Sequence, residues 1–93
     1  MQRVKVLVDG RVQGVGYRYF VEKQAVRYRI SGHVKNLPGG TVEIDAEGEV
    51  DQIRDFLEQC HQGPPMARVD LFHRLDVTPY GHTRFRILHH EEL

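Results

Sequence analysis

The sequence changes from strand to helix periodicity within residues 3–28, RVKVLVDGRVQGVGYRYFVEKQAVRY. Its first part alternates apolar and polar residues, which is typical of a β-strand with Val4, Val6 and Val8 on one face. Its last part has an apolar and aromatic stripe at helical spacing: Tyr17, Phe20, Val21, Gln24, Ala25 and Tyr28. A glycine-rich loop separates the two parts. This stretch therefore predicts a strand, a loop and an amphipathic helix.

Similar signals continue to the end of the chain. Residues 30–37 and 41–47 predict two strands that form a hairpin about the turn Pro38-Gly39-Gly40. A second helical stripe follows, made of Val50, Ile53, Phe56, Leu57 and Cys60, and Gly63-Pro64-Pro65 ends it. Two more alternating runs predict the last strands, with Val69, Leu71, Leu75 and Val77 in one and Phe85 and Ile87 in the other.

The expected element order is β-α-β-β-α-β-β. Each amphipathic helix needs an apolar sheet face to cover, and two helices on one face of a mostly antiparallel sheet meet that need. We expect an α+β sandwich of the ferredoxin-like β-α-β-β-α-β type with an extra strand. Residues 1–93 should form one domain, in which residues 89–93 are a frayed tail.

Composition narrows the class of protein. The 93 residues include 13 basic and 13 acidic side chains, so net charge does not favour a nucleic acid or an anionic membrane as partner. The single cysteine, Cys60, excludes an intrachain disulfide. No apolar run approaches the roughly 18 residues of a membrane span. We therefore expect a cytoplasmic protein that binds neither membrane nor nucleic acid.

The loop before the first helix has the properties of an anion site. Gly14 and Gly16 allow sharp turns that expose backbone amides, and the helix start adds a partial positive charge. Arg18, in the first helical turn, offers a planar fork of donors that suits two phosphate oxygens. The glycines alone fit a tight strand-to-helix connection equally well. A nucleotide is disfavoured, since Tyr19 breaks the dinucleotide pattern and the Gly-Lys-Ser/Thr of a P-loop is missing.

Two longer strings resemble the signatures of the acylphosphatase family. The first string is GRVQGVGYR at residues 10–18, and the second is GHVKNLPGGTVE at residues 32–43. Gly48, Gly63-Pro64 and Ala67-Arg68-Val69 also resemble the family, so the similarity extends from about Val4 to Ile87. It implies the same α+β sandwich that the periodicity predicts.

The resemblance also implies a function: metal-independent hydrolysis of acyl phosphates to a carboxylate and inorganic phosphate, with no cofactor. In this family the loop arginine, here Arg18, binds the substrate phosphate, and an asparagine at the end of the second strand, here Asn36, is catalytic. The amides of Gln13, Gly14, Val15, Gly16, Tyr17 and Arg18 would complete the phosphate cradle. Phosphate or sulfate would inhibit, and the protein would be a monomer. Before Leu37-Pro38, Asn36 also fits ordinary turn chemistry.

Other polar residues have simpler interpretations. His33 stands where the family more often has an aromatic residue, which we interpret as a packing or surface variation. Four histidines, at positions 33, 61, 73 and 82, are scattered without ligand spacing, and His89 and His90 lie in the tail, so no metal site is expected. Cys60 should pack on the second helix.

Two alternatives to the enzyme come from other classes of protein. One is a non-catalytic or slow anion-binding regulatory module, like the acylphosphatase-like domains of larger maturation proteins. The other is an RNA-binding module, which would need exposed aromatic side chains on the sheet and a basic face. The central strands instead offer mainly Val, Ile and Ala.

Overall fold

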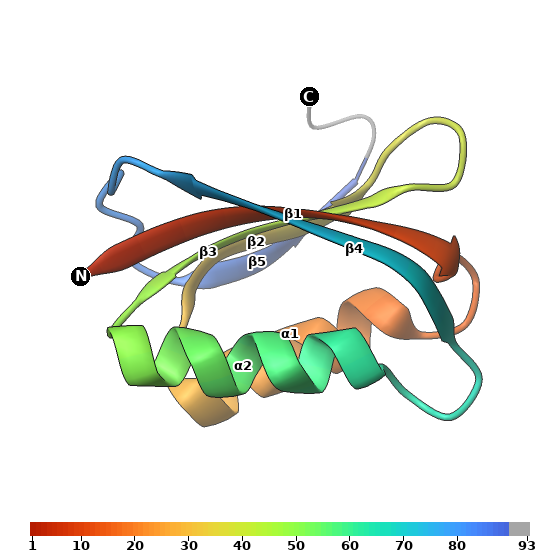
Figure 1. Cartoon of the computed structure of the whole chain (residues 1–93), viewed down its shortest axis with the longest axis horizontal. Coiled ribbons are helices and arrows are strands. Elements are labelled where there is room, and N and C mark those ends of the chain that lie inside the picture. The colour runs from red at the N-terminus through yellow and green to blue at the C-terminus, as the bar shows by residue number, and fades with distance from the viewer. Residues whose placement is uncertain (90–93) are drawn as a thin grey trace.

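The computed structural model describes residues 1–89 and contains two helices and five strands (Figure 1). In chain order these are β1 (Gln2–Arg11), α1 (Tyr17–Tyr28), β2 (Ser31–Asn36), β3 (Val42–Gly48), α2 (Val50–Gln62), β4 (Arg68–Val77) and β5 (Phe85–Leu88). The predicted order of elements is confirmed. Within residues 1–89 no helix is long and apolar enough to cross a membrane. Residues 90–93 of the tail expected to fray lie outside the described residues.

The sheet has the strand order β4-β1-β3-β2-β5, and both helices lie against one of its faces (Figure 1). Strand β3 pairs antiparallel with β1 and with β2, and β4 pairs antiparallel with β1. Only β5, the extra strand, is parallel to its neighbour β2. This is the predicted ferredoxin-like α+β sandwich. The end of β1 and the end of β2 reach the same edge of the sheet, because α1 returns the chain for a second parallel strand.

The core lies between this sheet and the two helices. Val4, Val6 and Val8 are fully buried, as the alternation in β1 predicts. The helices add two sets of buried residues: Tyr17, Val21 and Ala25 from α1, and Ile53, Phe56, Leu57 and Cys60 from α2. Val50, which the helical stripe of α2 also includes, is 59% exposed and is the first residue of the helix.

The last long strand departs from the prediction. In β4, Leu71 and Leu75 are more than half exposed, whereas Val69 and Phe72 pack against the core. An irregularity between Asp9 and Gly10 of β1 shifts the β1–β4 register. A one-residue shift reverses which side chains face the core, so Val69 and Leu71 do not share a face.

Candidate active site

Two glycines give the loop between β1 and α1 its shape. Gly14 has a φ of 75° and Gly16 a φ of 77°, both in the left-handed region that side chains other than glycine disfavour. Gly16 is also the N-cap of α1, where no side chain accepts a hydrogen bond from the first helical amides. The start of α1 therefore has free amide donors.

The amides of this loop make few internal contacts. Outside the regular elements, no backbone–backbone hydrogen bond within residues 1–89 uses an amide between Gln13 and Arg18 as donor. Free amides at a helix start, with the partial positive charge of the helix behind them, suit an anion.

A cavity of about 150 Å³ opens at this loop. Its lining residues are Val12, Gly14, Gly16, Tyr17, Arg18, Tyr19 and Asn36. The fold thus brings Arg18 and Asn36, which come from different elements, to one cavity. Arg18 is the only charged residue among them, so the lining favours an anion and offers no carboxylate to bind a metal ion.

The position of Arg18 depends on the C-terminal strand. One terminal nitrogen of its guanidinium donates a 3.1 Å hydrogen bond to the carbonyl oxygen of Leu88 in β5. This partner is 70 positions away in the sequence, and no local motif indicates it. The bond uses one donor of five and orients the rest of the guanidinium, which makes no other side-chain hydrogen bond within residues 1–89.

Asn36 has an unusual buried atom. Its side-chain oxygen Oδ1 is shielded from solvent and has no hydrogen-bond partner within residues 1–89. Leaving a buried amide oxygen without a donor costs about 1–3 kcal/mol. Because Asn36 lines the cavity, a donor molecule bound there, such as water, would satisfy this oxygen.

Two predicted cradle residues, Gln13 and Val15, are not among the residues that line the cavity. Nε2 of Gln13 donates to the carbonyl oxygens of Leu37 and Thr41, each at 3.0 Å, and so ties the loop to the β2–β3 turn. The side chain of Val15 packs against the core. Only the backbone amides of these two residues are therefore candidates for the cradle.

The cavity lining also includes two residues that the sequence did not point to. Val12 is buried and Tyr19 is 68% exposed. Both are adjacent to predicted cradle residues, which is the only signal in the sequence that could have indicated them.

Cys60 packs on α2 as predicted. It is fully buried, and burial raises the pKa of its thiol. A thiol of this kind stays protonated near neutral pH and is a poor nucleophile.

The prediction that the histidines are scattered is wrong for two of them. His33 and His82 converge on Asp45, and His33 lies in the middle of β2, three residues before Asn36. The pairing of β2 with β3 places His33 beside Asp45, and the loop before β5 brings His82 to the same carboxylate, so spacing in the sequence does not show this contact. A second cavity, of about 280 Å³, lies beside these histidines. It is larger than the first but contains none of the predicted active-site residues.

Comparison with known proteins identifies relatives. A family model described as Acylphosphatase matches residues 4–87. The chain is 43% identical over 91 residues to a protein named Acylphosphatase from Geobacillus thermodenitrificans, and the alignment covers 96% of each chain.

Two solved structures show the same similarity at the level of the fold. A crystal structure of acylphosphatase from Bacillus subtilis superimposes with a TM-score of 0.92 at 40% identity, covering 95% of this chain and 99% of that one. A structure of T. kodakarensis HypF matches with a TM-score of 0.86 at 34% identity, covering 96% of this chain but 12% of that one. The similarity therefore spans almost the whole length of the Bacillus subtilis acylphosphatase and a small part of T. kodakarensis HypF.

Proposed function

The chain belongs to the acylphosphatase family, and we propose that Arg18 and Asn36 are the residues with which it hydrolyses acyl phosphates. Hydrolysis of an acyl phosphate gives a carboxylate and inorganic phosphate. The relatives that match over nearly their full length favour this activity over a non-catalytic regulatory module. The geometry of the smaller cavity supports a separate role for each of the two residues.

The phosphate is bound by Arg18 and the free amides of residues 13–18. A phosphoryl group in transfer spreads negative charge over its equatorial oxygens, so catalysis consists mainly of positioning and charge stabilisation. The guanidinium supplies a positive charge that Leu88 holds in place, and the amides supply fixed dipoles. Neither must reorganise when the transition state forms.

Asn36 positions the attacking water. The observation that carries this role is the buried, unpartnered Oδ1 of Asn36, a residue that lines the cavity. An amide oxygen there accepts a hydrogen bond from the water and aligns it with the phosphorus, as a glutamine does in GTPases. The amide is not a strong base, so the water proton passes to a phosphate oxygen.

The reaction then needs no further group. The water oxygen bonds to phosphorus while the bond between phosphorus and the acyl oxygen breaks, and the electron pair leaves with the carboxylate. A carboxylate is a good leaving group and needs no general acid. Arg18 performs the charge stabilisation that a metal ion provides in other phosphoryl-transfer enzymes.

Three narrower expectations accompany this proposal. Free phosphate or sulfate competes with the substrate, because either anion presents the same oxygens to the cradle. The protein acts as a monomer, since the proposed catalytic residues come from one chain. Its cytoplasmic location stays a prediction from the sequence.

Hydrolysis of benzoyl phosphate by the purified protein tests the proposal. We expect chelator-insensitive turnover by the wild type. Asn36→Ala should lose turnover but keep competitive inhibition by phosphate, because the cradle is intact. Gln24→Ala is a matched control, since Oε1 of Gln24 in α1 is also buried without a partner but does not line the cavity.

Three results would contradict the assignment. Full turnover by Asn36→Ala would exclude the water-positioning role. Loss of both turnover and phosphate binding in that variant would indicate a structural role. A rate that a chelator abolishes and added metal restores would exclude the metal-free mechanism.

A further inference from the structure

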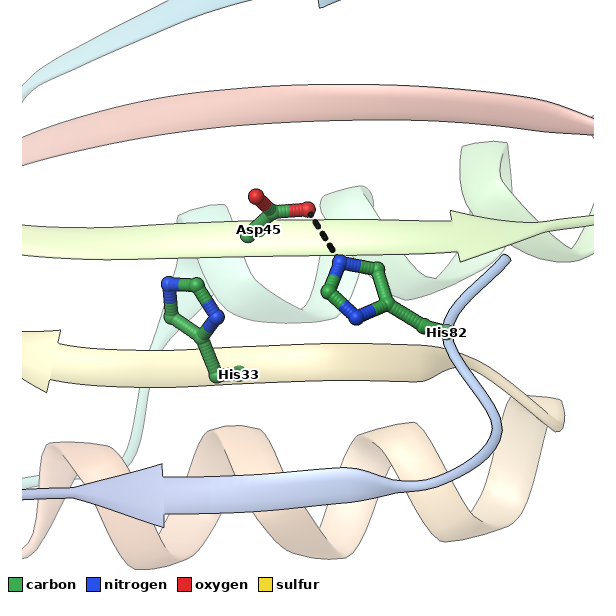
Figure 2. A group of neighbouring side chains, drawn as sticks. All are labelled: His33, Asp45 and His82. Atoms are coloured by element: carbon green, nitrogen blue, oxygen red, sulfur yellow. Dashed lines mark hydrogen bonds and ion pairs between the residues drawn. The ribbon is translucent and has the colours of Figure 1, made fainter. Parts of the chain in front are cut away.

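Three side chains outside the active site converge on the sheet face that the helices do not cover. His33 of β2 pairs in register with Asp45 of β3, and His82 of the loop before β5 approaches the same carboxylate (Figure 2). One ligand atom from each of the three residues lies within 4.8 Å of the other two. Asp45 is almost fully buried, and both histidines are largely buried.

The hydrogen bonds of His33 leave one of its ring nitrogens free. Its Nε2 lies 3.3 Å from Oε1 of Glu43. A carboxylate accepts only, so Nε2 carries the proton in this contact and Nδ1 keeps its lone pair. Figure 2 shows that this second nitrogen is on the side of the ring that faces His82. A carboxylate behind a histidine is the usual outer-shell support of a metal-binding imidazole.

The other two ligands are also oriented. Nε2 of His82 lies 3.1 Å from Oδ1 of Asp45. The same carboxylate accepts hydrogen bonds from Arg3, with Nε at 3.0 Å from Oδ1 and a terminal nitrogen at 2.8 Å from Oδ2. A bound ion would replace the contacts at Oδ1, and Arg3 would keep Oδ2 as an outer-shell partner. The guanidinium charge opposes a cation, so Arg3 limits the affinity of the site.

We propose that His33 Nδ1, Asp45 Oδ1 and His82 Nε2 bind a divalent transition-metal ion, for which Zn²⁺ is the best match. Two imidazoles and one carboxylate suit Zn²⁺, whereas Mg²⁺ and Ca²⁺ prefer oxygen ligands. Ligands at about 2.0–2.1 Å from a tetrahedral ion lie about 3.3 Å apart. The ligand atoms lie within 4.8 Å of one another, so the three groups must approach by at most about 1.5 Å.

The fourth position of the ion would face the larger cavity. His33 and His82 line this cavity together with Tyr80, Thr83, Arg84 and Arg86. On binding, the Nε2 proton of His82 moves to its Nδ1 or to solvent, so affinity should fall at low pH.

The proposed ion is a structural ligand, separate from the reaction. It would join β2, β3 and the loop before β5, while Asn36 lies three residues along β2 from His33, about 10 Å away for an extended strand. An ion that binds only the folded state stabilises it by mass action. The expected effect is a higher Tm with an unchanged rate of hydrolysis, so this proposal and the catalytic one can fail independently.

Calorimetric titration of the chelator-treated full chain with Zn²⁺ tests the site. We expect one Zn²⁺ ion per chain and no binding of Mg²⁺. His33→Phe and His82→Ala should each weaken Zn²⁺ binding by more than 100-fold, since loss of an outer-shell group alone costs about 10–100-fold. Glu43→Ala should weaken Zn²⁺ binding by about 10–100-fold, because it removes only the outer-shell partner of His33. Co²⁺ bound to the wild type should show the visible spectrum of a tetrahedral ion, and His33→Phe should lose it.

Two control variants separate this cluster from the other histidines. His73→Ala, on the exposed surface of β4, and the double variant His89→Ala/His90→Ala should bind Zn²⁺ like the wild type. Zn²⁺ binding that survives both His33→Phe and His82→Ala would overturn the proposal. Binding that disappears in the double variant instead would assign the ion to the tail. If either His33→Phe or His82→Ala unfolds, the Zn²⁺ affinity of Glu43→Ala and the Co²⁺ spectrum of the wild type still distinguish a site at this cluster from a site in the tail.

Discussion

The hydroxyl of Tyr17 donates a 2.7 Å hydrogen bond to the carbonyl oxygen of Cys60. It joins the first turn of α1 to the last turn of α2 inside the core, beside the loop that forms the proposed cradle. Burial raises the pKa of Tyr17, so this donor stays protonated. The bond thus links the packing of the two helices to the position of the active-site loop.

Removal of this donor should destabilise the protein. Tyr17→Phe leaves the Cys60 carbonyl oxygen buried without its partner, and we expect a loss of about 1–3 kcal/mol in the free energy of unfolding. Urea denaturation measures it. Tyr19→Phe removes an exposed hydroxyl two residues away and should change stability by less than about 0.5 kcal/mol. Equal effects from the two variants would show that the buried bond contributes nothing.

Arg18→Ala should abolish turnover and inhibition by phosphate together. An arginine that stabilises the transition state of phosphoryl transfer contributes about 10³–10⁵-fold in rate. Steady-state hydrolysis of benzoyl phosphate with and without phosphate measures both effects. Arg54→Ala, on the exposed face of α2, is the matched control and should behave like the wild type. Competitive inhibition by phosphate that persists in Arg18→Ala would contradict the binding role.

The shape of the cradle depends on the left-handed conformation of Gly16. A Cβ at Gly16 meets no atom within 4 Å, so Gly16→Ala tests backbone strain alone. The left-handed conformation should cost the alanine about 1–2 kcal/mol. We expect slower hydrolysis and weaker phosphate inhibition, because relief of the strain moves the amides. Gly81→Ala has a comparable φ of 93° and the same open space, but lies away from this cavity. It should lose similar stability and keep its hydrolysis rate; a parallel loss of rate would argue against a specific cradle.

Glu47 should make stability depend on pH. Burial tends to raise the pKa of Glu47, but hydrogen bonds from the amides of His82, Gly81 and Tyr80 outweigh it, and the net shift is downward. The stabilisation is therefore complete above the ordinary value of 4.5 and is lost as the pH falls through the lowered folded value.

Urea unfolding at pH values above and below 4.5, in buffer free of divalent cations, tests this pH dependence of stability. The stability difference between the wild type and Glu47→Gln should shrink as the pH falls below about 4.5. The comparison with the variant removes the contributions of the other carboxyl groups. A difference that stays constant with pH would show that the charge on Glu47 is not what the amides stabilise.

Cys60 should resist alkylation in the folded protein. Its side chain is fully buried and its pKa is raised, so reagent reaches a thiolate only through unfolding. Mass spectrometry after iodoacetamide treatment should show an unmodified native chain and complete modification in urea. Fast labelling of the native protein would contradict the packing described for α2.

Local sequence patterns predicted most of the fold. Alternation in β1 and the helical stripes of α1 and α2 identified the core, because burial on one face imposes a period of two on a strand and 3.6 on a helix. The proposed active-site residues were also named from the sequence. Arg18 lies within a glycine-rich motif that suits an anion, and Asn36 was named from the resemblance of residues 32–43 to the acylphosphatase family.

Long-range pairing decided the rest. The register irregularity at Asp9 exposes Leu71, which alternation alone places with Val69. The Leu88 carbonyl that orients Arg18 comes from a strand 70 positions later.

The convergence of His33 and His82 on Asp45 likewise exists only in the folded chain. The sequence by itself determined the element types, the core faces of β1, α1 and α2, and the residues of the proposed active site, since these depend on local periodicity and short motifs. The tertiary structure alone decided how Arg18 is oriented and which histidines meet. These contacts join segments that are far apart in the sequence, a helix or a loop with a strand, so no local pattern encodes them.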